Sequence, residues 1–385
     1  MVLEKNHQAG VKILASGGTH CNVTSTLAMP ELGQAFGARG GRFLRTSLWE
    51  FGPKAVRKLL DAEGVPTSEH PLEKVFPASM RAIDVRDALL RNMMRQGADL
   101  RLSSPVTSIG ITDAGGFCVE TNEETLRAGQ LIVTTGGCSF PKTGTTGDAF
   151  GWLEAMGHTI SPLRPALVPL VVQLDWVRSL TGISIEGAAV RVLDKKGRVI
   201  LQRQRPVLFT HRGLSGPGPM DASGALGEDP ENRQLVIDWI PKIDQNETQQ
   251  RLTPIRGDER NILQRFDDLL PRRLLSALLK QADIAINQTP SQLRKHERGK
   301  LIEALKACHI PVVGNEGFAK AEITAGGVLP DEVSPRTMES RMVPNLFLAG
   351  EVLDIDGPIG GFSFQLAFST GHLAGQSAAR QAKET

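Results

Sequence analysis

The chain has 385 residues, of which 40% are hydrophobic and 22% are charged, and its formal net charge is +2. This length fits two domains, one of which can be split in the sequence. The small net charge indicates neither a nucleic-acid partner nor an anionic membrane surface, and no apolar run reaches the roughly 18 residues that span a bilayer. The first ten residues, MVLEKNHQAG, lack the apolar segment of a secretory signal.

Four cysteines, Cys21, Cys118, Cys138 and Cys308, are scattered along the chain, with no CxxC pair and no metal-ligand spacing. We therefore expect reduced thiols, a cytoplasmic protein and no metal site. The 40 glycines occur in clusters, which indicates tight turns and close approach of the backbone to another group.

The first third of the chain mixes short strands with helices. A short apolar strand at residues 1–4 ends at Glu4. Apolar periodicity predicts helices at 49–62 and 84–96, with Asp84 as the N-cap of the second helix and Gly97 as its stop. Strands are then predicted at 106–111, 117–121 and 131–133, and the last of these is apolar throughout.

The composition changes near residues 164–165, and a glycine-rich composition returns at 325–327. The block between these points contains several strands followed mostly by helix. We therefore predict that one domain comprises two segments of the chain, and that a second domain lies between them in the sequence. The strands of the block are expected near 168–174, 188–193, 199–202 and 235–239.

Three motifs carry chemistry. An acidic residue at the end of a strand, such as Glu4, can bind the ribose hydroxyls of a dinucleotide, although alone it is more often a solvated charge. The strand that runs into Gly136 and Gly137 can bring the backbone close to a ligand, or be an ordinary turn. No G-x-G-x-x-G pattern occurs anywhere in the chain.

The third motif is the most specific. The segment NLFLAGE is an apolar strand that ends in Gly350 and Glu351, and Gly360 and Gly361 then open a long helix. The acid can bind a polyol hydroxyl, and free N–H groups at a helix start favour an anionic ring edge. Small residues along this helix permit close packing on a sheet.

These segments, above all AEITAGGVLPDEVSPRTMES and NLFLAGEVLDIDGPIGGFSFQLAFSTGHLAG, resemble the BaiN/aminoacetone-oxidase family of FAD-binding oxidoreductases, also called HI-type flavoproteins. The resemblance implies an α/β fold. A Rossmann-like FAD-binding domain, 1–164 and 321–385, would be interrupted by an inserted β-rich α+β domain at 165–320. Family members begin with a strand, G-x-G-x-x-G and a helix, and this unit is missing here, so we expect a truncated N-terminus and weak FAD binding.

The resemblance also implies a set of FAD contacts. Glu4 would hold the adenosine ribose, Gly136 and Gly137 would pass the pyrophosphate, and Gly350 and Glu351 would meet the ribitol. The remaining expected contacts are Gly17, Gly18 and Asn22 along the flavin, Gly360, Gly361 and Gln365 at the isoalloxazine, and Lys12 and Val106 near the nucleotide.

Two departures from the family pattern stand out. Thr19 and His20 replace the usual Gly-Arg, and Phe362 and Ser363 replace the usual Tyr-Asn. The first change exchanges a permanent cation for a titratable ring.

The function expected is an FAD-dependent oxidoreductase, acting as dehydrogenase, reductase or oxidase on a small-molecule substrate, with NAD(P)H docking transiently. One alternative is a reductase with a dedicated NAD(P) domain, which would need a further glycine motif. The other is a non-catalytic remnant that acts as a binding protein. His211 is the best acid–base candidate, although a structural histidine is more common, and catalytic residues stay unassigned.

Overall fold

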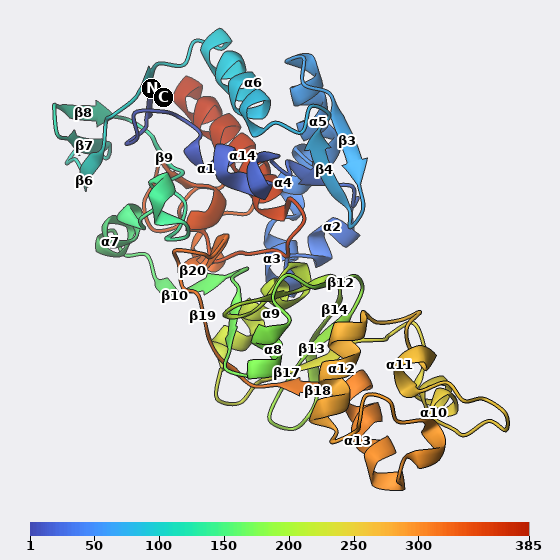
Figure 1. Ribbon diagram of the computed structural model, residues 1–385. Helices are drawn as coiled ribbons and strands as arrows, with labels where there is room; N and C mark the ends of the chain where they lie inside the picture. The colour runs from blue at the N-terminus through green and yellow to red at the C-terminus, as the bar shows by residue number, and fades with distance from the viewer. Residues whose placement is uncertain (385) are drawn as a thin grey trace. The chain divides into compact units, whose positions relative to one another are not determined.

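The computed structural model describes residues 1–384 and divides into two compact units (Figure 1). Unit 1 comprises Met1–Pro165 and Glu322–Thr385, and unit 2 comprises Ala166–Ala321. The borders expected from composition differ from these by one residue each.

The two segments of unit 1 are joined through a strand pair. Strand β9 (Leu131–Val133) pairs in parallel with β21 (Leu346–Leu348), so that Leu346 lies opposite Leu131. The two segments of unit 1 therefore contribute neighbouring strands to one sheet.

Unit 1 holds its strands in several small sheets rather than in one broad sheet. Strand β1 (Val2–Leu3) pairs in parallel with β5 (Leu100–Arg101), and no described strand links this pair to β9 and β21. The other sheets are β2-β4-β3, β6-β7-β8 and β10-β20. Their strands are β2 Thr24–Ser25, β3 Thr67–His70, β4 Lys74–Pro77, β6 Val106–Ile111, β7 Phe117–Thr121, β8 Thr125–Ala128, β10 Ile160–Ala166 and β20 Ile323–Val328.

Two apolar side chains on the parallel strand pairs are exposed. Val2 has 41% and Ile132 has 38% of its surface accessible, whereas Val133 and the three residues of β21 are buried. The strand predicted at 131–133 is therefore apolar throughout but is not buried at Ile132.

The C-terminal helix α14 (Phe362–Glu384) packs on strand β21 and on helix α4, near which it is labelled in Figure 1. Ala374 and Ala378 are buried, as close packing requires. A Cβ added at Gly371 or Gly375 would meet nothing within 4 Å, so the structure does not require glycine at these two positions for steric reasons.

The helix expected at 49–62 is two helices. Helix α4 (Arg45–Glu50) ends before Gly52, and α5 (Pro53–Ala62) begins with proline at its first position, where the missing N–H costs nothing. Helix α6 (Ala82–Arg95) stops before Gly97, as expected, but Asp84 lies in its first turn and is not its N-cap. The other helices of unit 1 are α1 Val11–Ala15, α2 Glu31–Gln34, α3 Gly37–Phe43 and α7 Asp148–Ala155.

Unit 2 has two antiparallel sheets around one apolar core. Their strand orders are β12-β15-β16-β11-β19 and β14-β13-β17-β18, and Trp239, Phe209 and Phe266 are buried in the shared core. The strands are β11 Leu170–Val172, β12 Ser184–Ile185, β13 Ala189–Leu193, β14 Val199–Gln204, β15 Val207–Thr210, β16 Gly213–Ser215, β17 Gln234–Asp238, β18 Cys308–Ile310 and β19 Val312–Asn315. The helices are α8 Asp175–Ser179, α9 Pro217–Glu228, α10 Gln245–Arg251, α11 Ile262–Arg265, α12 Arg272–Gln281 and α13 Lys295–Lys306.

Among the described residues, no helix has both the length and the apolar content to cross a membrane. Within the same range, no group of His, Cys, Asp and Glu side chains is arranged to hold a metal ion.

Candidate functional site

Glu4 directly follows strand β1, and one of its two carboxylate oxygens accepts hydrogen bonds. The backbone N–H and the side-chain amide of Asn6 both donate to Glu4 Oε1, at 2.8 and 2.9 Å. No described residue donates a hydrogen bond to Oε2 of Glu4. A carboxylate with one oxygen fixed and one available suits a ribose hydroxyl donor.

The same segment runs along the loop that follows β9. Asn6 Nδ2 donates to the carbonyl of Thr143 at 3.1 Å, and Gly144 (φ +92°) packs against the Asn6 amide so closely that a Cβ would lie 2.5 Å from it. Lys5 pairs with Asp148 at the start of α7. Although burial raises it, hydrogen bonds from Lys5 and Thr146 hold the pKa of Asp148 below its usual range.

Glu351 is at the centre of a polar cluster that joins both segments of unit 1. Its Oε1 accepts the backbone N–H of Thr324 at 2.9 Å, and its Oε2 lies 3.3 Å from Lys12 Nζ. A Cβ at Gly137 would lie 2.4 Å from Thr324 Oγ1 and 2.8 Å from Glu351 Oε1, so only glycine fits there. Three residues expected from the sequence, Lys12, Gly137 and Glu351, therefore meet.

The beginning of α14 is pinned to β2. Gly361 has a left-handed φ of +86°, and a Cβ there would lie 2.4 Å from the carbonyl oxygen of Thr24. The Gln365 side chain is fully buried: it accepts from Thr24 Oγ1 at 2.5 Å and donates to Phe51 O and Ser369 Oγ at 2.8 and 2.7 Å. The amide expected at the isoalloxazine is thus used inside the protein.

The glycine turn Ser16–Thr19 exposes its backbone. Gly17 and Gly18 have φ values of +53° and +64°, and space beyond Gly18 is open to 4 Å. Asn22, expected beside the flavin, instead accepts the backbone N–H of Val75 at 3.0 Å with its side-chain oxygen. His20 donates from Nδ1 to the carbonyl of Met80 at 2.7 Å.

The remaining expected contacts occupy backbone positions. Gly136 and Gly350 have left-handed φ values of +76° and +77°, and Gly350 donates its N–H to Thr370 Oγ1 at 2.9 Å. Gly360 has a φ of +142°, and Phe362 packs edge-on against Phe36. Val106 begins β6 and lies opposite Thr121 of β7.

Two thiols in unit 1 are less reactive because of burial, and the acid–base candidate lies in unit 2. Burial raises the pKa of Cys21 to about 11. Burial, followed by the carboxylates of Glu351 and Asp148, raises the pKa of Cys138, and a raised thiol pKa means little thiolate. Exposed His211, in unit 2, is on the turn between β15 and β16.

A row of side chains in unit 1 has the order of a hydrolase triad. His158 Nδ1 lies 2.9 Å from Glu332, and its Nε2 lies 2.8 Å from Ser340 Oγ. The hydroxyl oxygen of Ser340 also accepts the backbone N–H groups of Met342 and Val343. Both of its lone pairs are therefore used, so this row fixes a loop and does not form a nucleophile.

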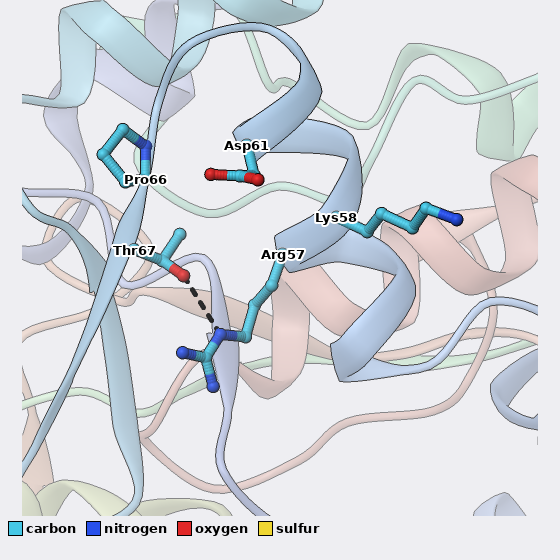
Figure 2. Close-up of a pocket in the computed structure, with 5 residues that line it drawn as sticks. All are labelled: Arg57, Lys58, Asp61, Pro66 and Thr67. Carbon is cyan, nitrogen blue, oxygen red and sulfur yellow. Dashed lines mark hydrogen bonds between the residues drawn. The ribbon is translucent and has the colours of Figure 1, made fainter.

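Two surface pockets lie around α5. One, of about 310 Å³, is lined by Arg57, Lys58, Asp61, Pro66 and Thr67, and Figure 2 shows Arg57 turned to the Thr67 hydroxyl, 3.0 Å away. Its polar groups brace α5 against β3. The second, of about 260 Å³, shares Pro66 with the first. None of the residues expected to contact FAD lines either pocket.

The residues of unit 1 fit FAD at the sugar and polyol ends. Glu4 keeps an open acceptor, Glu351 has spare acceptor capacity beside Lys12, and Gly18 leaves backbone exposed. The side-chain oxygens of Asn22 and Gln365 are hydrogen-bonded within the protein. The sequence did not predict a role for Thr324, Asn6 or Lys5. The glycines that contact two of them, Gly137 beside Thr324 and Gly144 beside Asn6, were the only indication in the sequence of a loop there.

This fold and site define an FAD-dependent oxidoreductase with a Rossmann domain. More narrowly, the chain belongs to the HI0933-like family, whose Rossmann-domain model matches residues 1–377. The resemblance expected from the motifs is therefore confirmed.

Similar curated proteins cover nearly the whole chain. A 3-dehydro-bile acid delta(4,6)-reductase of Clostridium scindens is 28% identical over 99% of this chain and 92% of its own length. A ribosomal RNA dihydrouridine synthase of Escherichia coli is 29% identical over 98% of this chain and 91% of its own length. A 3-ketosteroid-delta4-(5alpha)-dehydrogenase structure from Rhodococcus jostii is 14% identical, with a TM-score of 0.45 over 98% of this chain and 91% of that one.

Proposed function

We propose that this chain reduces a carbon–carbon double bond conjugated to a carbonyl group, with FAD bound in unit 1 and NAD(P)H as the reductant. The observation that carries the proposal is the chemistry shared by the two relatives' names. Dihydrouridine is uridine whose C5–C6 double bond, conjugated to the C4 carbonyl, is saturated. A 3-dehydro-bile acid with Δ4 and Δ6 bonds likewise has them conjugated to the 3-keto group.

The reaction adds a hydride to the carbon β to the carbonyl and a proton to the α carbon. NAD(P)H supplies the two electrons and is oxidised to NAD(P)⁺, and solvent supplies the proton. Bound FAD, when reduced, supplies the hydride. NAD(P)H would dock transiently, because the chain has no G-x-G-x-x-G pattern for a dedicated dinucleotide site.

The residues of unit 1 would hold the cofactor by its hydroxyl groups and its ring edge. Glu4 would accept from the adenosine ribose through its available oxygen, and Glu351, 3.3 Å from Lys12, would accept from the ribitol. The N–H groups at the start of α14, after Gly361, would favour negative charge at the isoalloxazine.

An anaerobic reoxidation experiment tests the proposal. The protein is mixed with excess FAD and reduced with NADPH, and then 2-cyclohexenone, a 4-en-3-one steroid or uridine is added, each beside its saturated counterpart. We expect a conjugated compound to restore the visible flavin band and to yield the saturated product, and the saturated counterparts to do nothing. Flavin reduction by alcohols or amines, with reoxidation by oxygen alone, would assign an oxidase instead.

A further inference from the structure

The small net charge of the chain is the sum of the charges of two units, one with a positive and one with a negative net charge. Unit 2 contains 23 Lys and Arg against 18 Asp and Glu, a net charge of +5, and the rest of the chain carries −3. The expectation of no nucleic-acid partner came from the average. It therefore does not apply to each unit separately.

The excess positive charge of unit 2 is concentrated in one hairpin, residues 191–205, which spans most of β13 and all of β14 (Figure 1). This segment contains six cations and one carboxylate, so the remainder of unit 2 is neutral, with 17 of each sign. The cations are Arg191, Lys195, Lys196, Arg198, Arg203 and Arg205.

The only carboxylate of the hairpin is turned into the hairpin's own turn. Asp194 accepts from the backbone N–H groups of Lys196 and Arg198, at 2.8 and 2.9 Å, and from the Arg198 guanidinium at 2.7 Å. Lys195 and Lys196 are exposed at the tip, and no ion pair with a carboxylate involves them in the described chain. Two cations are thus presented to solvent on a fixed turn.

The base of the hairpin is anchored. Asp221, buried in α9, lies 4.0 Å from the Arg203 guanidinium and 3.6 Å from that of Arg205. These two cations are partly compensated, and they hold β14 onto α9. The anchoring means that the tip can bind a partner without first being ordered, which lowers the entropic cost of binding.

The outer strand β14 has hydrogen-bond donors but no aromatic side chain. Among the described strands it pairs with β13 alone, and its exposed row includes Gln202 and Gln204. Gln202 accepts from Arg191 Nε at 3.2 Å, which leaves its amide N–H groups as donors. Cations and amide donors without aromatic rings suit the phosphates and 2′-hydroxyls of an A-form helix, whereas single strands are recognised by stacking.

We propose that the β13–β14 hairpin binds the backbone of double-stranded RNA. Phosphates would contact Lys195 and Lys196, and the amides of Gln202 and Gln204 would read 2′-hydroxyls. Arg191 is partly compensated, because its guanidinium lies 3.8 Å from Asp238 of β17. The proposal rests on the charge and geometry of unit 2, and it does not depend on FAD or on which molecule carries the reducible double bond.

The test measures the binding of a labelled RNA hairpin of roughly 16 base pairs by fluorescence anisotropy, at a series of salt concentrations from about 50 mM. Replacing both tip lysines (Lys195→Gln with Lys196→Gln) should weaken binding about tenfold at the lowest salt. The slope of log affinity against log salt should decrease by about 2, one unit for each lost phosphate contact. Circular dichroism would verify that the variant is folded.

The matched control removes the same charge elsewhere in unit 2. Lys280→Gln with Lys295→Gln changes two exposed lysines at the end of α12 and the start of α13, and it should leave RNA affinity within about twofold. Equal losses in both double variants would mean that only total charge matters and would overturn the proposal.

Three further outcomes would also overturn it: no RNA binding at low salt, equal binding of B-form DNA of the same sequence, or hairpin-dependent binding of phosphatidylserine vesicles in place of RNA. The last result would assign the exposed Val199 and Ile200 of β14 to a membrane surface instead.

Discussion

Replacing Gly137 with alanine tests whether the Glu351 cluster is packed as tightly as the structure shows. The new Cβ would lie 2.4 and 2.5 Å from Oγ1 and Cβ of Thr324 and 2.8 Å from Glu351 Oε1. The backbone of Gly137 is not in the left-handed region, so the cost is steric. Overpacking typically costs about 1–3 kcal/mol.

Moving Thr324 would add the loss of hydrogen bonds. Thr324 Oγ1 accepts the N–H of Cys138 and contacts the Ser139 hydroxyl, each at 2.7 Å, and each such bond contributes about 0.5–1.5 kcal/mol. We therefore expect Gly137→Ala to lower the free energy of unfolding by about 2–5 kcal/mol.

The assay is urea denaturation followed by circular dichroism, with Gly151→Ala as the control. Gly151 lies within α7, and an added Cβ would meet nothing within 4 Å. Alanine there should stabilise the helix by about 0.5–1 kcal/mol. If Gly137→Ala were as stable as the wild type, the close contact between Gly137, Thr324 and Glu351 would be refuted.

Three other outcomes follow from the structure. Gly361→Val should abolish flavin retention, because Gly361 has a φ of +86° and an added Cβ would lie 2.4 Å from Thr24 O. Normal flavin content, measured by absorbance, would contradict this. The pKa of Glu332 is lowered because, although burial raises it, hydrogen bonds from Thr159 and His158 outweigh burial. The ionised Glu332 therefore stabilises the fold above its unfolded pKa, near the ordinary 4.5, and this stability is lost as the pH falls through the folded pKa. Glu332→Gln should be less stable than the wild type at neutral pH, and denaturation curves should converge in acid; a constant difference would reject this. Cys21, with a pKa of about 11 from burial, should resist iodoacetamide at neutral pH in the folded protein, and rapid labelling by mass spectrometry would show the opposite.

Local features of the fold could be predicted because they depend on neighbours in the sequence. Strands 106–111, 117–121 and 131–133 are β6, β7 and β9 with the expected bounds, and α6 stops before Gly97. Apolar alternation and a glycine with positive φ suffice for these features.

Features that depend on distant contacts could not be predicted in the same way. Gln365 stands at the start of a helix in a flavin motif, yet its amide is fixed by Thr24 and Phe51, more than 300 positions away in the sequence. Thr324 acts on the loop after β9 through a contact 186 positions apart. No periodicity within a window of residues contains that information.

Averages over the whole chain also hid structure. The net charge of +2 concealed a unit of +5 whose excess lies in one hairpin, and the small-residue pattern of α14 did not show that an added Cβ at Gly371 or Gly375 would have open space. Both became visible only when the residues were assigned to units and faces.

The central claim, that unit 1 binds FAD through its acidic residues, is tested most directly by an FAD difference-spectrum titration of the wild type and Glu4→Gln. The substituted amide keeps an oxygen for Asn6 but replaces the second acceptor with a donor. We predict a saturable flavin spectral shift in the wild type and about a tenfold or greater loss of affinity in Glu4→Gln, since a hydrogen bond to a charged group is worth about 1.5–3 kcal/mol. The exposed Glu123→Gln control should bind like the wild type. A folded wild-type protein with no spectral shift at any FAD concentration, or equal affinity in Glu4→Gln, would contradict the account and favour the non-catalytic binding protein.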